Sequence, residues 1–400
     1  MTFRRQSKGR NGHMRHFCFL SGPRRVAWPG MPQEPIEVVY RVRAAKADID
    51  ARVEALLLEQ TVELPRSALR TAFVRENLVG RVVAIEQVGE AEHLVTLAQP
   101  RVAAADDPAQ LLNVLFGNCS LQPEIGLEDV RLPAALAGVL GGPRFGIAGL
   151  RRLLGIHGRA ITASVLKPIG LSVKETASLC ATLALSGLDI VKDDHGLADH
   201  SFSPFVERVA ACLAATRAAE QRTGRRTLYV PNLIGPPATV VRQARQAKEL
   251  GAGAVMVSPM LVGLPLLNQL AGEIGMPVIA HPAFGGSPRI SPVALLGRLF
   301  PLFGADAVIY PNFGGRFSYS RGSCAEIAGA LRSPGAGIAP AFPVPAGGMT
   351  IEGMPAVLDF YGPDVVLLIG GSLLDSPDEA ALLSRSSQFV AAVHSHRFTR

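Results

Sequence analysis

Hydrophobic and polar residues change their spacing part of the way along this chain. From about residue 158, short runs of Val, Ile, Leu and Ala alternate with longer runs in which apolar residues recur at helical spacing. The short runs predict strands near residues 160–167, 187–193, 227–233, 252–258, 277–281, 306–311, 338–345 and 365–370. The helices predicted after them lie near residues 171–186, 204–222, 237–250, 264–274, 291–303, 323–332, 351–361 and 377–394.

Eight strand–helix units fit into about 240 residues, which is the size and repeat of a (β/α)8 TIM barrel. The strands are apolar at nearly every position, as is typical of parallel strands buried on both faces. A doubly wound α/β sheet is the alternative fold, but eight regular units exceed its usual number.

Residues 34–120 follow a different pattern. Residues 36–42 alternate like a strand, residues 48–60 have helical spacing, and residues 81–85 and 93–97 predict two further strands. This mixture predicts a small α+β domain of ferredoxin-like type before the barrel. We place the boundary in the apolar, Gly- and Pro-rich stretch 121–157, so that the two domains cover residues 34–150 and 151–400.

The composition excludes two broad classes of protein. Hydrophobic residues make up 48% and charged residues 18% of the 400 residues, so the chain can bury a large core and is not disordered as a whole. No stretch of about 18 residues is apolar without a break by a charge, Gly or Pro, so we expect no membrane span.

The net charge of +7 comes from one end of the chain. Residues 1–30 contain seven Lys and Arg residues and no acidic residue, so residues 31–400 are formally neutral. A neutral body has no general field that attracts a polyanion, so we expect no nucleic-acid partner. Residues 1–33 are expected to be a basic extension: a disordered tail, a targeting segment, or sequence upstream of a true start at Met31.

The cysteines and the common catalytic motifs narrow the chemistry. The five cysteines are odd in number, far apart and without a CxxC pair, which favours a reducing cytoplasm over a disulfide framework or a cysteine zinc site. The chain also lacks HExxH, GxSxG, a P-loop and a GxGxxG after a strand, which are the motifs of other large enzyme classes.

Polar and charged residues gather where the predicted barrel strands end. In a TIM barrel, catalytic groups come from these carboxyl-terminal strand ends. The candidates are Lys167 after the first strand, Lys192, Asp194 and His195 after the second, His281 after the fifth, Arg316 after the sixth, Gly347 and Gly348 after the seventh, and Gly370 and Gly371 after the eighth.

Each candidate has a chemical use and a structural alternative. The glycine pairs would let backbone N–H groups approach a phosphate, or would only form tight turns. Lys167, desolvated at the end of an apolar strand, fits proton transfer, but it could instead pair with Asp194. Asp194 offers an oxygen to a hard cation, whereas Asp193 points to the other side of the strand and is expected to be structural.

Two further candidates stay open in the same way. His281 is either a proton shuttle or phosphate contact, or a buried histidine whose hydrogen bonds are satisfied. Arg316 follows two glycines in a loop that could close over an anionic substrate, or it is a surface arginine.

Two motifs together resemble the large chain of ribulose-bisphosphate carboxylase (RuBisCO). They are SVLKPIGLS at residues 164–172 and GLDIVKDD at residues 187–194, with a matching spacing between Lys167 and Lys192. The resemblance covers roughly residues 34–395 and implies the two-domain layout expected above. It also implies that Lys192 is carbamylated and binds Mg²⁺ with Asp194, and that Lys167 transfers protons.

The sequence departs from the carboxylases at several matched positions. His195 stands where their glutamate ligand is found, which leaves His195 as the candidate third ligand, and Ile169 and Arg316 replace two lysines. Pro282 and Ile309 replace residues of one phosphate site, whereas the four glycines of the other phosphate site are kept. The resemblance therefore implies a substrate with one phosphate and no fixation of CO₂.

These departures are similar to those of the RuBisCO-like proteins, the fourth form of the family, and especially of their non-photosynthetic branch. Residues 58–65, 192–199 and 310–319 carry this closer resemblance. In the family, the N-terminal domain of one subunit completes the barrel site of the other. Glu59 and Asn118 match the polar pair delivered in this way, so the resemblance implies a homodimer in which both residues bind substrate.

The resemblance implies a Mg²⁺-dependent enzyme that forms an enediolate on a sugar monophosphate, with His281 in contact with the substrate. The expected reaction is decarboxylation, or another carbon–carbon cleavage, of a 3-oxo sugar-acid phosphate. The alternative is an isomerase or enolase of the 5-methylthioribulose-1-phosphate type, used in sulfur salvage. A third interpretation is a barrel that has lost catalysis and serves as a scaffold, which need not bind magnesium.

Overall fold

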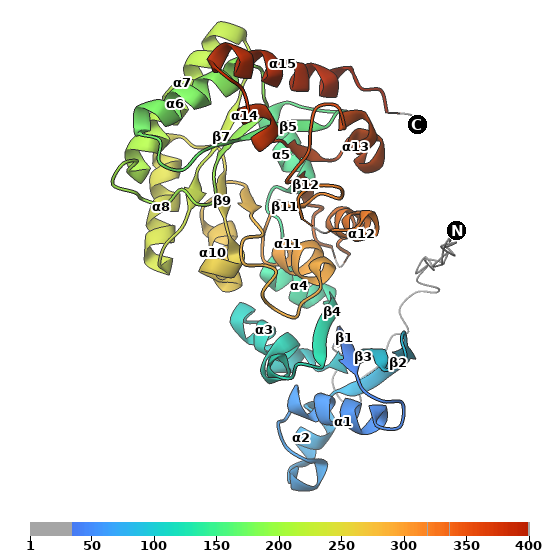
Figure 1. The fold of residues 1–400 in the computed structure, drawn as a ribbon. Helices are drawn as coiled ribbons and strands as arrows, with labels where there is room; N and C mark the ends of the chain where they lie inside the picture. The colour runs from blue at the N-terminus through green and yellow to red at the C-terminus, as the bar shows by residue number, and fades with distance from the viewer. Residues whose placement is uncertain (1–33, 318, 336, 399–400) are drawn as a thin grey trace, which may run out of the picture.

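A computed structural model of the chain describes residues 34–317, 319–335 and 337–398. The basic extension expected at residues 1–33 lies outside the described residues. The described chain forms two parts, a barrel wrapped in helices and a smaller domain below it (Figure 1). These two parts confirm the fold that the sequence predicts, a TIM barrel preceded by a small α+β domain.

The smaller part is an antiparallel sheet with the strand order β2-β3-β1-β4. Every second residue of β1 is buried against the core that β1 shares with α1, as its alternating pattern predicts. The strands are β1 (Ile36–Arg43), β2 (Arg81–Gln87), β3 (Glu92–Gln99) and β4 (Ile125–Arg131). The helical segments are α1 (Ile49–Glu59), η1 (Arg66–Ala68), α2 (Ala72–Asn77), η2 (Arg101–Ala104), α3 (Pro108–Phe116) and η3 (Asn118–Leu121).

Strand β4 lies in the stretch that the sequence analysis assigned to the domain boundary. A bulge interrupts the pairing of β4 with β1. The bulge breaks the alternation of buried and exposed residues by which a strand is recognised in a sequence. β4 also joins the two parts, because the Leu127 N–H donates to the Arg289 carbonyl at 2.9 Å and the Ser291 N–H donates to the Leu127 carbonyl at 2.8 Å. The smaller domain therefore holds the segment that follows the fifth strand of the barrel.

The barrel closes through one interrupted strand. Its order is β7-β6-β5-β13-β12-β11-β10-β9-β8, and all of its pairs are parallel. β7 and β8 are two halves of the strand predicted at 227–233, divided at Pro231, which has no N–H to donate. The strands are β5 (Ile161–Leu166), β6 (Ile190–Asp193), β7 (Leu228–Val230), β8 (Asn232–Leu233), β9 (Val255–Val257), β10 (Val278–Ala280), β11 (Ala307–Pro311), β12 (Phe342–Ala346) and β13 (Val366–Leu368).

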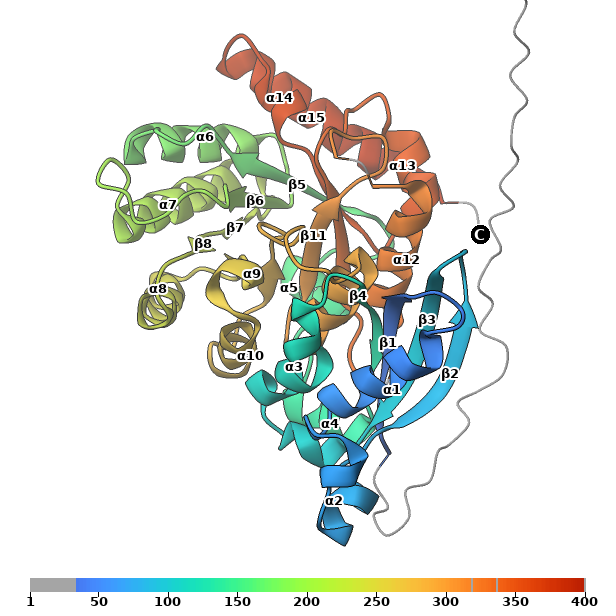
Figure 2. The ribbon, with the colours of Figure 1, turned by 60° about the horizontal axis from the view of Figure 1, so that its bottom comes forward.

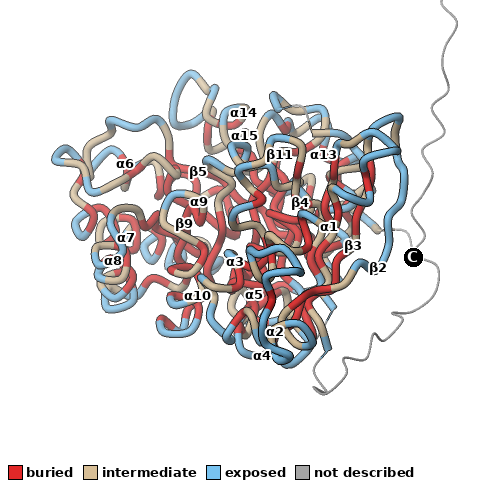
Figure 3. The backbone as a smooth tube through the Cα atoms, turned by 90° about the horizontal axis from the view of Figure 1, so that it is seen from below, coloured by how far each residue is buried: buried red, intermediate tan, exposed pale blue. Residues whose placement is uncertain are grey.

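The two halves place the same strand at both ends of the sheet, since β7 pairs with β6 and β8 pairs with β9. A doubly wound sheet, the alternative fold, has two separate edges and is excluded by this closure. The helices surround the strands in Figure 2, and Figure 3 shows buried positions gathered on the strands and exposed positions on the outer turns.

Seven of the predicted barrel helices are confirmed, and the fifth has an unexpected geometry. Residues 291–303 form the π-helix η4 (Val293–Leu299) followed by α11 (Phe300–Leu302). The short helices α9 (Pro259–Val262) and α14 (Gly371–Leu374) are additional. The confirmed helices are α6 (Val173–Leu185), α7 (Phe205–Thr223), α8 (Pro237–Leu250), α10 (Leu264–Glu273), α12 (Arg321–Arg332), α13 (Met354–Tyr361) and α15 (Glu379–Ser395).

Two further helices, α4 (Ala134–Leu140) and α5 (Gly146–Leu154), follow β4. Leu150 of α5 belongs to the same apolar cluster as the inward-facing residues of the barrel strands, so α5 packs against the barrel interior. The buried Asp306 carboxylate fixes the start of α5 by accepting the N–H groups of Phe145 at 2.6 Å and Gly146 at 2.7 Å. The junction between the two parts therefore lies between β4 and α5.

No helix in the described part of the chain is both long and apolar enough to cross a membrane. The four cysteines of this part, Cys119, Cys180, Cys212 and Cys324, are buried free thiols. Cys18 lies outside the described residues.

Candidate active site

A cavity of about 820 Å³ opens at the carboxyl-terminal ends of the barrel strands. All the residues that the sequence predicted at these strand ends contribute to its wall, although they come from six different strands and the loops that follow them. They are Lys167, Lys192, Asp194, His195, His281, Arg316, Gly347, Gly348, Gly370 and Gly371.

Lys192 is a buried amine, only 4% exposed, whose Nζ donates to the Asp193 carbonyl at 3.1 Å. Burial lowers the pKa of Lys192 to about 8, because a low-dielectric surrounding disfavours the charged form. The positive charge of Lys167 acts in the same direction, and the negative charges of Asp194 and Asp193 oppose it. About a tenth of Lys192 is therefore a neutral, nucleophilic amine at pH 7.

Asp194 is the anionic centre of the cavity. Burial alone would raise its pKa, but the hydrogen bond from His195 and the charge of Lys167 outweigh burial and hold the pKa of Asp194 well below its usual range. The Asp194 Oδ1 lies 3.2 Å from His195 Nδ1 and 3.3 Å from Lys167 Nζ. The pairing of Lys167 with Asp194, the structural alternative left open above, thus occurs within the cavity itself.

His281 is held neutral in a fixed orientation. Its ring stacks on His195 with the centroids 4.1 Å apart, and its Nδ1 accepts the Ala283 N–H at 3.1 Å. Burial lowers the pKa of His281 to about 2, and the charge of Lys192 adds to this effect. With Nδ1 occupied, the ring proton lies on Nε2, so His281 fits a hydrogen-bond donor to substrate better than a shuttle that takes up protons.

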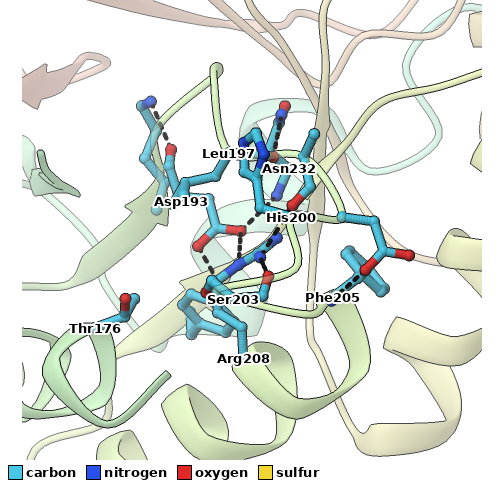
Figure 4. Close-up of polar contacts among 12 residues, drawn as sticks. Thr176, Asp193, Leu197, His200, Ser203, Phe205, Arg208 and Asn232 are labelled. Atoms are coloured by element: carbon cyan, nitrogen blue, oxygen red, sulfur yellow. Dashed lines mark hydrogen bonds and ion pairs between the residues drawn. The ribbon is translucent and has the colours of Figure 1, made fainter. Parts of the chain in front are cut away.

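Asp193 leaves the barrel on the opposite side of β6, as expected for a structural residue. Its carboxylate accepts the Tyr229 hydroxyl at 2.7 Å and the Asn232 N–H at 3.2 Å, and it pairs with Arg208 at 3.2 Å. Both members of the ion pair are fully buried. Figure 4 shows Arg208 of α7 reaching from Asp193 to Ser203.

Arg208 and Asn232 also clamp the loop that carries His195. The Arg208 Nη1 donates to the carbonyls of Ala198 at 3.1 Å and Ser203 at 2.6 Å, and Asn232 Nδ2 donates to the carbonyl of His195 at 3.0 Å. The sequence analysis missed Arg208. Its signal is a charge on the buried side of an amphipathic helix, which requires a buried partner.

Arg316 is carried by a loop between β11 and α12 that is fastened at both ends to α13. At its start, the Tyr361 hydroxyl donates to Asn312 Oδ1 at 2.8 Å. At its end, the guanidinium of Arg321 lies 4.7 Å from the centre of the Phe360 ring and 5.2 Å from that of Phe313. Arg316 is thereby presented to the cavity from a tethered segment.

The glycine loops approach each other closely. A Cβ at Gly315 would collide with the Gly347 carbonyl oxygen, and a Cβ at Gly348, which has a φ of +90°, would lie 2.9 Å from the Arg316 nitrogen. A Cβ at Gly370 would lie 2.7 Å from a Val165 methyl group. Backbone approaches backbone at Gly315 and Gly348, and a side chain approaches backbone at Gly370, so a Cβ would not fit at any of the three positions. Glycine backbone of this kind can also approach an anion closely.

Glu59 and Asn118 lie away from this cavity, in the smaller domain of the same chain. Asn118 Nδ2 donates to Glu59 Oε1 at 3.1 Å. Gln60 brings the pair together, because its amide donates to the Val114 carbonyl at 2.9 Å and accepts the Cys119 N–H at 3.1 Å. Leu121, in the same segment as Asn118, is 80% exposed.

One part of the cavity wall is apolar. It contains the positions at which the sequence lacks the residues of one phosphate site of the carboxylases. Pro282 and Ile309 both line it, and neither brings a charge or a side-chain hydrogen bond. Phe284, Pro292, Leu295 and Leu296 extend this apolar wall.

The donors present fit a magnesium ion only if Lys192 is modified. Among the described residues, no group of three His, Cys, Asp or Glu side chains is arranged to hold a metal ion. Asp194 supplies carboxylate oxygen, and His195 already contacts that carboxylate through Nδ1. A carbamate on Lys192 would add the oxygen donor that a hard cation requires, and the lowered pKa of this amine favours its formation.

Comparison with known proteins identifies relatives over nearly the whole chain. A family model described as the ribulose bisphosphate carboxylase large chain, catalytic domain, matches residues 146–282. The chain is 46% identical to ribulose bisphosphate carboxylase-like protein 1 of Rhodopseudomonas palustris, over 91% of this chain and 98% of the relative. It is 42% identical to 5-methylthioribulose-1-phosphate isomerase of Rhodospirillum rubrum, over 90% and 96%.

A solved structure agrees with these relatives. The crystal structure of a Rubisco-like protein from Rhodopseudomonas palustris superimposes with a TM-score of 0.85 and 43% sequence identity. The match covers 92% of this chain and 100% of that one, so both domains share its fold.

Lys192 should react as an amine with a pKa near 8. Acetic anhydride acylates only neutral amines and does not itself ionise, so we expect modification of Lys192 to rise with pH to a midpoint near pH 8 and then level off. Mass spectrometry of the peptide that contains Lys192 measures the rate, and the Lys192→Met variant identifies the signal. A rate that is still rising between pH 9 and pH 10 would contradict the lowered pKa.

Arg208→Met should strongly destabilise the protein, because it leaves the Asp193 carboxylate buried without a counter-charge. We expect a loss of about 3–5 kcal/mol in the free energy of unfolding, measured by urea denaturation. Arg217→Met, on the exposed side of the same helix, should have little effect. The Asp193→Asn substitution should restore part of the loss in the double variant, and a double variant no more stable than Arg208→Met would contradict the pairing.

Proposed function

The chain belongs to the ribulose-bisphosphate carboxylase large-chain family as a RuBisCO-like protein, and we propose that it is an isomerase- or enolase-type enzyme of a methylthio-substituted sugar monophosphate. A proton leaves the carbon next to the carbonyl to give an enediolate, and a proton returns to the neighbouring carbon or oxygen. No carbon dioxide is fixed. The name of the Rhodospirillum rubrum relative, 5-methylthioribulose-1-phosphate isomerase, supports this reaction type.

The observation that carries the proposal is the uneven lining of the cavity. Glycine backbone after β12 and β13 forms one part of the wall, where N–H groups can reach a phosphate. Pro282, Pro292, Leu295 and Leu296 form another part, which offers no side-chain charge to a second phosphate. A substrate with one phosphate and one apolar end fits this lining, and a bisphosphate would bury one phosphate without a partner.

The side chains at the centre fit proton transfer. Lys167 is the proposed acid–base, because its amine is partly exposed and is oriented by Asp194. The neutral His281 would donate its Nε2–H to a substrate oxygen, since its Nδ1 is already occupied. Arg316 would bring a positive charge from its tethered loop.

We propose magnesium as the cofactor, which Asp194, a carbamate on Lys192 and His195 would hold. When bound, Mg²⁺ would stabilise the negative charge that develops on the enediolate oxygens. The neutral amine of Lys192 is the form that adds carbon dioxide, so its lowered pKa supports the carbamate.

Decarboxylation of a 3-oxo sugar-acid phosphate, the reaction expected from the sequence, stays a second prediction. It would pass through the same enediolate and use the same phosphate site. The apolar wall favours the methylthio compound, because a sugar acid brings a further charge or hydroxyl to that end. A scaffold without catalysis would not need Lys192 buried beside Asp194 at the mouth of the barrel, so this burial favours an enzyme.

We also propose a homodimer in which Glu59 and Asn118 act on the cavity of the second subunit. The pair is held rigidly by Gln60, yet it does not line the cavity of its own chain.

Proton exchange tests the reaction. Incubation with 5-methylthioribulose-1-phosphate, magnesium and bicarbonate in deuterated water should place deuterium on the carbon next to the carbonyl without loss of carbon, as followed by proton NMR. Lys167→Met should slow the exchange by about 100-fold or more, because general acid–base catalysis contributes at least that much.

Other outcomes of the same experiment separate the candidates. Loss of a carboxyl carbon from a 3-oxo sugar-acid phosphate, with no exchange on the methylthio compound, would establish decarboxylation instead. No reaction with either compound, together with no heat of magnesium binding, would contradict both enzyme proposals.

Subunit mixing tests the shared site. Glu59→Gln and Lys192→Met should each be nearly inactive, and a mixture of the two should regain about a quarter of the wild-type activity. This value follows because half of randomly paired dimers are mixed, and each mixed dimer has one intact site. Activity that does not recover, although native mass spectrometry detects mixed dimers, would contradict the proposal that Glu59 acts in the site of the second subunit.

A further inference from the structure

Phe284 combines two features that are unfavourable for a phenylalanine in the free protein. Its backbone has a φ of +65°, in the left-handed region that bulky residues seldom adopt. Phe284 is also 64% exposed, although it lies on the wall of the cavity. Strained residues of this kind persist where their surroundings hold them, and they cluster at ligand sites.

The turn around Phe284 is held by several hydrogen bonds. The Gly285 N–H donates to the Pro282 carbonyl at 2.9 Å, and the Ser287 hydroxyl donates to the Phe284 carbonyl at 2.8 Å. The Ala283 N–H donates to His281 Nδ1, so the same turn fixes the ring orientation of His281. The same turn therefore holds the backbone of Phe284 and the ring of His281, which also lines the cavity.

The turn also packs on the apolar part of the wall. A Cβ built on Gly285 would lie 2.9 Å from the Pro282 carbonyl oxygen and 3.2 Å from a methyl carbon of Leu295, so the backbone of the turn lies close to Leu295. The glycine pairs that fit a phosphate follow β12 and β13, whereas Phe284 follows β10. Phe284 thus stands beside the wall that fits the end of the substrate without a phosphate.

We propose that Phe284 determines substrate specificity by covering the apolar end of the bound sugar phosphate, a thioether group. This inference rests on the proposed function, because it requires the phosphate to lie at the glycine pairs. A thioether packs favourably against an aromatic ring, and its contact removes the exposed ring from water. A hydroxyl in the same place would lose its water without gaining a partner, so the ring should separate the two kinds of substrate.

The test compares two ligands in the full-length protein. Calorimetry measures the affinities for 5-methylthioribulose-1-phosphate and for ribulose-1-phosphate in a Lys167→Met background, which prevents turnover. We expect Phe284→Ala to reduce the preference for the methylthio compound about tenfold or more, with the affinity for ribulose-1-phosphate changed less than about twofold. Phe284→Leu should keep part of the preference for the methylthio compound. Phe202 is a half-exposed phenylalanine outside the cavity wall, so the control variant Phe202→Ala should keep all of the preference.

Two results would overturn the inference. Equal loss of affinity for both ligands would make the ring a structural residue. An unchanged preference, together with a fall in the mass of the assembly measured by light scattering, would make the ring a subunit contact.

Failure of the proposed reaction can be distinguished from failure of the proposed role of Phe284. One outcome is that the protein with Lys167 intact gives no proton exchange with the methylthio compound while Phe284→Ala still changes the preference between the two ligands. In that case the ring binds a thioether and the enzyme catalyses another reaction. If exchange occurs and the preference does not change, only the role of Phe284 is wrong. If the protein binds neither ligand, both proposals fall.

Discussion

The geometry of the cavity depends on the alternation of side chains along β6. Successive residues of a strand point to opposite faces, so Asp193 leaves the barrel while Lys192 and Asp194 face the cavity. The fully buried ion pair between Asp193 and Arg208 holds the end of the strand in this register, because separating two buried charges is costly. Lys192 is then confined to an apolar interior, and this confinement lowers its pKa.

The two domains contribute to the same chemistry in different ways. β4 of the smaller domain holds the segment around Arg289 and Ser291, and this segment leads directly into Pro292 on the apolar wall. The smaller domain thus supports one side of the cavity within its own chain. In the proposed dimer, its Glu59 and Asn118 would also complete the cavity of the partner, so the position of one domain would influence two sites.

The barrel and most of its site could be predicted from the sequence for a physical reason. A buried parallel strand needs apolar residues throughout, so polar residues such as Lys167 and His281 stand out where a strand ends. The topology of a TIM barrel then brings all strand ends to one rim, whatever their separation in sequence. Side chains alternate between the two faces of a strand, and this alternation alone predicted the face of β6 on which Asp193 lies.

The remaining features depend on tertiary packing that local patterns do not show. Arg208 finds Asp193 only after α7 has docked on the barrel, and β4 is hidden by its bulge. The left-handed backbone of Phe284 carries no sequence signal, since glycine is the residue expected there. The reaction was the least determined feature, because cleavage and isomerisation use the same enediolate and the same phosphate site.

In the proposed binding mode, the phosphate lies at the glycine pairs, and the apolar end of the sugar phosphate lies against the wall formed by Pro282, Pro292, Leu295 and Leu296. A crystal structure of the Lys167→Met variant with 5-methylthioribulose-1-phosphate tests it most directly. We expect density for the phosphate at the N–H groups of Gly347, Gly348, Gly370 and Gly371, with the sulfur against Leu295 and Phe284. A phosphate found beside Pro282, or a ligand bound outside the barrel mouth, would contradict it.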